Sequence, residues 1–558
     1  FEWDGKPQLV AGTTYMASDV QRQFFMQPNP HLWDQEMAEM RAGGLNMLRT
    51  GWWSAYDQVM KESGVVREDM LRAVEAYLLT ARKNDLPVQF TFFAFIPEMF
   101  GGANPYLDPE ALRRQKELIV AVVQRFRDVP YVVWDLINEP SFSNPRRLWA
   151  TRPNGDPFEM RAWNEWLLQK YKTPGAIAQA WQTTPFPPGA APLPEEWEFA
   201  PKAAMRTNQG SNALKVHDYY MFAQEKLRDW AAELKSAIRS AGGNQLVTIG
   251  QDEGGGTDRL APVFFGDAVD FTVTHPWWLD DAVLWDTLVA KIANKPLLVQ
   301  EVGQQRLPQI NGYERRTPQD VSNLVERKVA IAGQTSAGAI QWLWHTNGFM
   351  KNDNEMVIGA LREDGTEKPE AQMLRRFAQF AAATRGLLSS PEDREVVIVT
   401  SQALQYSALN SFALEAQQKA VRALEYYCRV AARVVTENRL AELGSPKLAI
   451  LPSPQTLSDP AWALLMKYVE AGGTLLVSGS MERDPNWQVT ERLKALGLEA
   501  KPEPLFYRQA QIELGRQTIP LSYDGQPQQF IEALATADGK TFHELNRGKG
   551  TILVANFP

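Results

Sequence analysis

The 558-residue chain contains a single cysteine, Cys428. One cysteine excludes an internal disulfide and a cysteine-rich zinc site, and it leaves the redox compartment undecided. Histidine is also scarce. The five histidines are scattered along the chain without the spacing of a metal-binding motif: His31, His217, His275, His345 and His543. We therefore expect no metal site, and no motif in the chain indicates a cofactor.

Long apolar runs and basic blocks are missing as well. No stretch approaches the roughly 20 consecutive apolar residues that a membrane-spanning helix needs. The 58 Lys+Arg residues are outnumbered by 66 Asp+Glu, which gives a net charge of -8, and they form no cluster that would neutralise a run of phosphates. The sequence predicts a soluble protein without membrane or nucleic-acid partners. Its compartment stays open between the cytoplasm and, after removal of a leader, the periplasm or the exterior.

What the chain does contain is apolar material for more than one core, because 44% of its residues are hydrophobic. Residues 1–390 alternate short apolar runs with longer amphipathic segments, which is typical of repeated βα units. The expected strands are residues 9–17, 45–49, 88–93, 132–137, 245–249, 271–274, 296–301 and 338–344. Eight strands, each followed by a helical segment, predict a (β/α)8 TIM barrel. One insertion, residues 141–215, is rich in tryptophan and proline and would build the rim of the barrel.

A second α/β domain is expected over residues 391–558, beyond a boundary near Ser389-Ser390-Pro391. Buried-strand patterns occupy residues 395–401, 447–453 and 474–480, and a long helical pattern covers residues 412–432. Residues 484–558 have weak periodicity but end in GKGTILVANF, a candidate for the last strand of the same sheet. We expect an open α/β sheet with an uncertain tail.

Two expected barrel strands end in a carboxylate, and in this fold the active site lies at the carboxyl ends of the strands. Glu139 closes the fourth strand in VVWDLINEP, and Glu301 closes the seventh in PLLVQE. Two carboxylates that face one pocket suit acid–base or covalent catalysis. Glycoside hydrolysis uses such a pair, one as the acid and the other as nucleophile or base. Each glutamate alone has a simpler interpretation as a solvated strand end.

The Asn138-Glu139-Pro140 motif and the glutamate of the seventh strand resemble the signature of clan A glycoside hydrolases, which are retaining enzymes with (β/α)8 barrels. The resemblance implies that Glu139 is the general acid/base and Glu301 the nucleophile. It further implies that Asn138 binds the 2-hydroxyl of the sugar and that Arg49, at the end of the second strand, supports the nucleophile. We expect Arg49 to keep Glu301 ionised, and burial to make Glu139 titrate high.

The resemblance extends to further residues at strand ends. His275 ends the sixth strand, where the clan often has a tyrosine or histidine near the nucleophile. Trp344 matches the aromatic platform under the sugar, although Trp342 shares its strand face and either could serve. Trp52 and Trp277 follow strand ends, where aromatic faces suit the apolar faces of sugars. For each of these side chains, packing in the core is the alternative.

The whole chain resembles glycoside hydrolase family 42, whose members are mostly β-galactosidases and whose second domain is a flavodoxin-like module used in trimerisation. The resemblance implies a retaining exo-β-glycosidase that removes a terminal β-linked hexose from an oligosaccharide or glycoside, and a homotrimer. The family usually has Asn-Glu-Tyr-Gly where this chain has Asn138-Glu139-Pro140-Ser141, so a β-mannosidase or β-glucosidase stays beside the β-galactosidase. A carbohydrate-binding protein without catalysis is the alternative of another class.

Overall fold

The structure is a computed structural model that carries side chains. It describes residues 1–3, 5–53, 56–61, 64–200, 213–252, 259–277, 282–304, 309–311, 315–346, 348, 357–388, 394–408, 410–504, 510–514, 516–521 and 532–558. The predicted domain boundary near Ser389 and part of the predicted insertion lie outside these residues. The described chain forms two compact units, one of residues 1–158, 225–255 and 259–390, and one of residues 159–224, 256–258 and 391–558.

The first unit contains an eight-stranded parallel barrel, as predicted. Its strands are β3 (Val10–Thr14), β4 (Met47–Gly51), β5 (Val88–Ala94), β6 (Val132–Asn138), β9 (Val247–Gly250), β10 (Thr272–Thr274), β11 (Leu297–Val302) and β12 (Gly338–Gln341). They pair in the order β10-β11-β12-β3-β4-β5-β6-β9. The two end strands are joined by hydrogen bonds from Asp270 N to the Val247 carbonyl and from Thr248 Oγ1 to the Phe271 carbonyl, both 2.8 Å. The barrel is thereby nearly closed.

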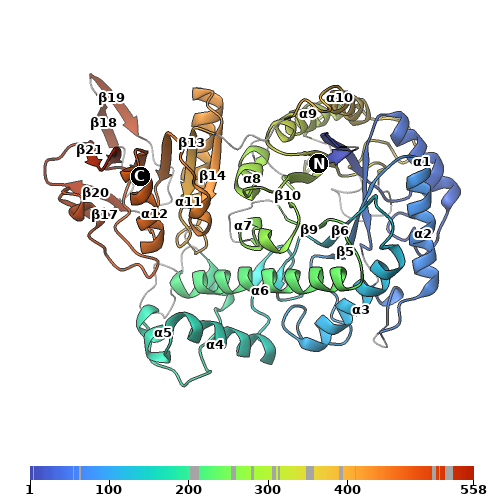
Figure 1. Ribbon diagram of the computed structural model, residues 1–558, viewed down its shortest axis with the longest axis horizontal. Coiled ribbons are helices and arrows are strands. Elements are labelled where there is room, and N and C mark those ends of the chain that lie inside the picture. The colour runs from blue at the N-terminus through green and yellow to red at the C-terminus, as the bar shows by residue number, and fades with distance from the viewer. Residues whose placement is uncertain are drawn as a thin grey trace. The chain divides into compact units, whose positions relative to one another are not determined.

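Helices surround the barrel strands (Figure 1). They are α1 (Pro30–Ala42), α2 (Glu68–Lys83), α3 (Pro109–Phe126), α6 (Ala213–Ser240), α7 (Pro262–Phe265), α8 (Ala282–Ala290), α9 (Pro318–Thr335) and α10 (Pro369–Ala383). Helix α3 illustrates how the sequence sets them: the Asp108 side chain caps its first turn, Pro109 occupies the first position, and Leu118, Val122 and Phe126 are buried along one face. No helix in the described part of the chain is long and apolar enough to cross a membrane.

Short elements complete the first unit. They are β1 (Glu2–Trp3), β2 (Lys6–Pro7), η1 (Tyr56–Gln58), β7 (Phe142–Ser143), β8 (Thr151–Arg152) and η5 (Gly266–Ala268). Strands β7 and β8 pair in parallel just after barrel strand β6, so they fix the start of the predicted insertion.

The second unit begins with helical elements from the predicted insertion, α4 (Pro157–Tyr171), α5 (Pro174–Ala180) and η2 (Glu196–Phe199), followed by the first half of α6. Trp163, Trp166 and Trp181 stack here, with ring centroids 5.8 and 6.0 Å apart and Trp163 in the middle. Buried Asp218 accepts hydrogen bonds from Lys170, Tyr171 and the Trp181 indole. These three tryptophans are therefore core residues rather than rim residues.

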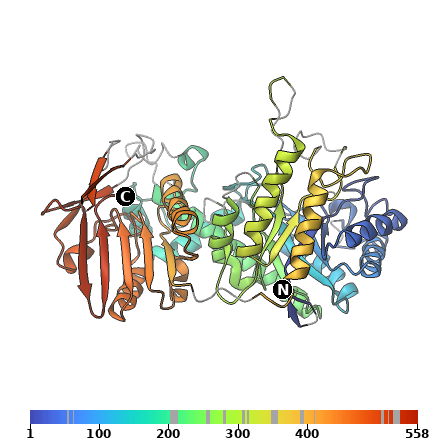
Figure 2. The ribbon, with the colours of Figure 1, turned by 90° about the horizontal axis from the view of Figure 1, so that it is seen from above.

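The C-terminal sheet of this unit has the order β14-β13-β15-β16-β22-β21, and its strands lie side by side in Figure 2. They are β13 (Val396–Thr400), β14 (Ala432–Thr436), β15 (Leu448–Pro452), β16 (Thr474–Ser478), β21 (Phe542–Arg547) and β22 (Gly550–Ala555). All neighbours are parallel except β21 and β22. In chain order the five parallel strands read 2-1-3-4-5, the flavodoxin-like arrangement. The predicted last strand is confirmed, because β22 pairs with β16.

Two details differ from expectation. The helix predicted over residues 412–432 is α11 (Asn410–Arg422), which continues as one π-helical segment, η6 (Ala423–Cys428). Arg429 then adopts a left-handed conformation with φ +55°, which ends the helix and lets β14 start at Ala432. The tail also has more strands than its periodicity indicated. The remaining elements are η7 (Glu437–Glu442), α12 (Asp459–Glu470), α13 (Arg492–Ala495), β17 (Ala500–Pro504), β18 (Ala510–Leu514), β19 (Gln517–Leu521) and β20 (Glu532–Thr536).

Candidate active site

The structure brings together the two glutamates that end barrel strands. Glu139 directly follows β6 with a left-handed backbone, φ +48°, and its amide donates to the Gly250 carbonyl of β9 at 2.6 Å. Glu301 lies in β11. One carboxylate oxygen of each glutamate and a ring nitrogen of His275 all lie within 4.8 Å of one another. Both glutamates are buried, with 7% and 4% of their surface exposed.

Arg49 connects the nucleophile candidate to the asparagine of the motif. Its Nη1 lies 2.5 Å from Glu301 Oε1, and its Nη2 donates to Asn138 Oδ1. The guanidinium is fully buried and lies over the Trp53 ring, 5.1 Å from its centroid. A planar guanidinium with several donors can hold two acceptors at once, which a lysine ammonium cannot do in the same geometry.

His275 is placed between hydrogen-bond acceptors on both sides. Its Nδ1 lies 2.9 Å from Glu139 Oε1, and its Nε2 lies 2.7 Å from Gln300 Oε1. The Gln300 amide nitrogen donates to Asp135, so Gln300 Oε1 is an acceptor and His275 Nε2 carries a hydrogen. A second proton is then shared across the Nδ1–Oε1 contact. The pair exists either as imidazolium with carboxylate or as neutral imidazole with protonated Glu139.

The charges around His275 and Glu139 explain why this pair retains its shared proton. Burial works to lower the pKa of His275, but the charges of Glu301 and Glu139 raise it above its ordinary value. Burial works to raise the pKa of Glu139, and the hydrogen bonds from His275 and Trp149 outweigh this and lower it. Burial, together with the nearby charge of Glu139, raises the pKa of Glu301 despite His275 and Arg49. These directions are the reverse of our expectation for the two glutamates, because nothing in the sequence indicates that His275 binds Glu139.

Asp135, together with its partners Thr91 and Gln300, lies behind the site and was not singled out from the sequence. Asp135 is buried within β6 and lies 3.6 Å from Arg49 Nη2. It accepts hydrogen bonds from Thr91 Oγ1, Gln300 Nε2 and the Gly250 amide at 2.8 to 2.9 Å. Burial raises the pKa of Asp135 against the opposing effect of Arg49. A charged residue inside a run as apolar as VVWDLI is the signal that could have identified it, since buried charges require partners.

The predicted aromatic residues divide into two groups. The Trp277 indole donates to Glu301 Oε2 at 2.8 Å, and Trp277 packs in one cluster with Trp53 and Trp342. Trp342 also lies under the Arg49 guanidinium, 6.0 Å from ring centroid to Cζ. Trp344 is as buried as Trp342, with 4% and 5% of their surface exposed, and Trp52 packs edge-on against Phe90 of the barrel wall. The contacts thus bring Trp277 and Trp342 to the charged centre, and the role expected for Trp344 stays a prediction.

Trp149 is a further neighbour of the acid candidate. Its indole Nε1 donates to Glu139 Oε2 at 2.7 Å. The ring meets Phe95 edge-on, with centroids 4.9 Å apart, and 46% of the residue is exposed. Trp149 is one of several tryptophans in the predicted insertion, and nothing local to it in the chain indicates that it lies beside Glu139.

Glu139, His275 and Glu301 are also close enough together to hold a metal ion. The Arg49 cation at 2.5 Å from Glu301 occupies one face of that carboxylate, and the shared proton lies between His275 and Glu139. A divalent cation would have to displace the proton and approach the guanidinium. The donor set therefore fits proton transfer better than metal binding.

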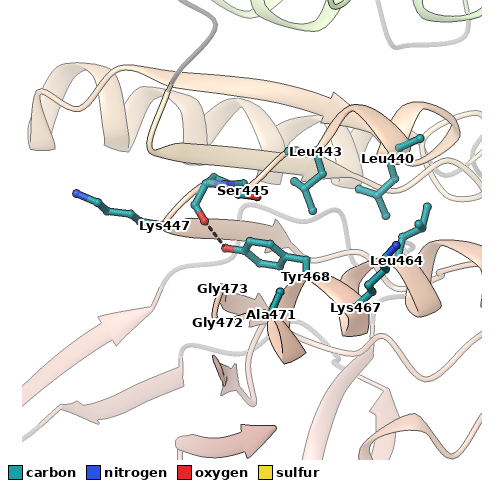
Figure 3. A pocket seen from close by; sticks show the side chains of 13 residues that line it. Leu440, Leu443, Ser445, Lys447, Leu464, Lys467, Tyr468, Ala471, Gly472 and Gly473 are labelled. Atoms are coloured by element: carbon teal, nitrogen blue, oxygen red, sulfur yellow. Dashed lines mark hydrogen bonds between the residues drawn. The ribbon is translucent and has the colours of Figure 1, made fainter. Parts of the chain in front are cut away.

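A separate hollow of about 560 Å³ lies in the second unit, before the amino ends of β15 and β16 (Figure 3). Its lining includes Leu440, Leu443, Lys467 and Tyr468. The tyrosine hydroxyl already donates to backbone carbonyls, 2.9 Å from that of Thr474. No carboxylate is among the described residues that line this hollow. It is thus a poor candidate for acid–base chemistry.

Comparison with solved structures finds proteins of the same fold over nearly the whole chain. A catalytic variant of Gan42B, a GH42 β-galactosidase from G. stearothermophilus, matches with TM-score 0.76 and 13% identity, covering 99% of this chain and 85% of that one. The cold-adapted β-galactosidase of Rahnella sp. R3 also has TM-score 0.76 and 13% identity, over 99% and 86%. The exo-β-1,4-mannosidase Op5Man5 from Opitutaceae bacterium strain TAV5 matches with TM-score 0.64 and 13% identity, over 99% and 92%.

Two other comparisons are negative. No profile of a known protein family matches the sequence. No curated protein matches it either. The structural neighbours include GH42 β-galactosidases and other clan A glycoside hydrolases, and at this identity the likeness establishes a shared fold: a (β/α)8 TIM barrel followed by an α/β domain.

Proposed function

We propose that this protein is a retaining β-glycosidase that cleaves by double displacement, with Glu301 as nucleophile and Glu139 as general acid/base. The observation that carries the proposal is the approach of the two carboxylates to within 4.8 Å at the carboxyl ends of barrel strands. Retaining enzymes have their two carboxyl groups about 5–5.5 Å apart, whereas inverting enzymes leave about 6.5–9.5 Å for a water molecule.

In the first step, Glu301 Oε attacks the anomeric carbon while the bond to the leaving oxygen breaks, and Glu139 donates a proton to that oxygen. His275 supplies this proton along the 2.9 Å contact from Nδ1 to Glu139. In the second step, ionised Glu139 takes a proton from water, and the water oxygen displaces Glu301 from the sugar. Arg49 and Trp277 hold Glu301 in place throughout, through one oxygen each.

The substrate we propose is a terminal β-linked hexose, with galactose first and mannose or glucose next. Solved proteins of this fold include β-galactosidases and an exo-β-1,4-mannosidase, which supports this range. Asn138 accepts from Arg49 through Oδ1, so its amide nitrogen is oriented to donate to a sugar hydroxyl. Trp342 is our choice for the platform under the sugar, because it lies in the Trp53–Trp277 cluster.

The homotrimer remains a proposal that rests on the flavodoxin-like module. The five parallel strands of the C-terminal sheet have the expected order, which supports the module but not its assembly. Its test is a mass measurement, given in the Discussion.

The mechanism is tested with alanine variants of the two glutamates and aryl β-glycosides of different leaving-group pKa. Glu301→Ala should abolish turnover of all of them. Glu139→Ala should slow substrates with basic leaving groups by about 10²- to 10⁴-fold and affect activated ones far less, because an activated aryl group needs little protonation.

Azide distinguishes the two roles. It should rescue Glu139→Ala by attacking the glycosyl intermediate, and the product should be the β-glycosyl azide. An α-glycosyl azide would overturn the assignment. If the wild type turns over no member of a broad panel of aryl galactosides, mannosides and glucosides, a carbohydrate-binding protein becomes the better account.

A further inference from the structure

Trp149 combines a hydrogen bond to the acid candidate with an exposed ring. In the insertion, Trp163, Trp166 and Trp181 are at most 8% exposed, whereas Trp149 is 46% exposed. A half-exposed indole beside buried carboxylates needs an explanation, because tryptophan usually buries its large apolar surface.

The loop that carries Trp149 is held in one conformation. Its amide donates to Ser141 Oγ at 2.7 Å, and the neighbouring Ala150 carbonyl accepts from the Phe142 amide at 2.9 Å. The β7–β8 pairing then anchors both ends of the loop. The indole is therefore prepositioned, and its hydrogen bond to Glu139 adds a further tie.

Phe95 packs edge-on against Trp149, and the two rings form an aromatic corner beside Glu139. The Phe95 amide donates to the Asn138 carbonyl and its carbonyl accepts from the Ser141 amide, both 2.7 Å. Phe95, Glu139 and Trp149 all have left-handed backbones, with φ +61°, +48° and +55°. Such conformations are costly for residues other than glycine and cluster at functional sites. Three of them converge on the acid candidate.

The two carboxylate oxygens of Glu139 face different neighbours, and this indicates where the substrate lies relative to Phe95 and Trp149. Oε1 faces His275, whose Nδ1 lies 3.8 Å from Glu301 Oε2. The anomeric carbon that Glu301 attacks should therefore lie on the side of Oε1. Oε2 accepts from Trp149. A leaving group departs from the anomeric carbon on the side opposite the nucleophile and must meet the acid. The part of the substrate beyond the cleaved oxygen then lies next to the exposed Trp149 ring.

We propose that Trp149, supported by Phe95, is the aromatic platform for the leaving group, and that this leaving group is a pyranose ring whose apolar face stacks on the indole. The inference rests on the proposed glycosidase function and specifies its substrate as a disaccharide or longer saccharide rather than a glycoside of a small alcohol. By its N–H, Trp149 also acts as a positioning residue for Glu139.

The test compares two substrates with the same glycone. One is the β-linked disaccharide that the wild type cleaves best, and the other is the corresponding β-glycosyl fluoride, whose leaving group has no ring to stack. Trp149→Ala should lower kcat/KM for the disaccharide by about tenfold or more relative to the fluoride. Trp149→Phe keeps a ring and should restore most of that ratio.

The hydrogen bond from the Trp149 indole N–H is tested separately, by the pH dependence of kcat/KM in the same two variants. It stabilises ionised Glu139, so in both variants the pair of His275 and Glu139 should hold its shared proton more tightly, and the basic limb of the kcat/KM profile, which reports the loss of that proton, should move to higher pH. The matched control is Trp197→Ala. Trp197 is 40% exposed and donates its indole N–H to Glu195 at 2.7 Å, and its loss should change neither the substrate ratio nor the limb.

Equal losses on the disaccharide and the fluoride in Trp149→Ala would overturn the platform. If the wild type cleaves no glycoside, the proposed function is wrong. The platform is then tested on its own, by measuring the affinity of saccharides for the Glu301→Gln variant. A disaccharide should then bind more tightly than its terminal monosaccharide, and Trp149→Ala should remove that difference. Unchanged disaccharide affinity in Trp149→Ala would overturn the platform in this case as well.

Discussion

At the scale of single residues, the site depends on how the negative charges of three buried carboxylates are compensated. Asp135, Glu139 and Glu301 share one arginine and the proton held near His275. A buried charge without a partner costs free energy, so the three carboxylates stay buried only because Arg49 and His275 compensate their charges. The positions of Glu139, Glu301 and Arg49 follow from strand ends and are predictable from the sequence. Asp135 is recognisable only as a charge inside an apolar run, and Gln300 and Trp149 are not predictable, because nothing in the residues around them indicates which side chain each will contact.

Arg49 offers a direct test of this balance. Its charge lowers the pKa of Glu301, so Arg49→Met should raise that pKa further. Since the nucleophile must be ionised, the acidic limb of the kcat/KM profile should move to higher pH, and kcat/KM at the optimum should fall by about 10²-fold or more.

Arg49→Lys separates charge from geometry. The ammonium keeps the positive charge but loses the fork that reaches Glu301 and Asn138 together, so kcat/KM should fall while the acidic limb stays near its wild-type position. Circular dichroism of both variants would check that they fold. An unmoved limb in Arg49→Met would contradict the role that we assign to Arg49.

At the scale of elements, the barrel strands were predicted well because each is a short apolar run followed by an amphipathic helix. The segment after α11 was predicted less well. Residues 423–436 stay apolar at helical spacing, and the left-handed turn at Arg429 has no glycine or proline to mark it. Likewise, nothing local in the sequence indicates that the two tryptophans of α4 stack with Trp181, which directly follows α5, within the second unit.

His217 on α6 should make the second unit sensitive to acid. Burial lowers the pKa of His217 to about 4, and its Nδ1 lies 3.1 Å from the Tyr406 carbonyl, to which it donates as a neutral ring. Between this value and about 6.5, the ordinary value for histidine, the unfolded chain binds the proton more readily than the folded chain. Stability should therefore fall as the pH drops from about 6.5 to 4, by about 3 kcal/mol from this group.

His217→Asn provides the comparison for this prediction. Asparagine places an amide donor near the position of Nδ1 but does not titrate. Urea unfolding followed by tryptophan fluorescence at pH 7 and at pH 4.5 should show a smaller loss of stability in the variant than in the wild type. Equal losses in the two proteins would show that His217 is not responsible.

At the scale of the whole molecule, the proposed homotrimer has a simple measurement. The chain mass is 62.9 kDa, and light scattering at micromolar concentration should report three times this value. Tyr427 is 85% exposed in η6 of the second unit, where a contact between copies would cover it. A mass near 62.9 kDa would rule out the trimer, and it would leave the active-site proposal unaffected because every catalytic residue belongs to the first unit.

In the proposed mechanism, Glu301 forms a covalent bond to the sugar. This bond can be detected from the mass of the intact protein after incubation with 2-deoxy-2-fluoro-β-glycosyl fluorides of the galacto, manno and gluco series, followed by peptide mapping. We expect a single added fluorosugar on the peptide that contains Glu301, and none in Glu301→Ala. A label on another residue, or inversion of configuration in the wild-type product, would show that Glu301 is not the nucleophile of a retaining enzyme.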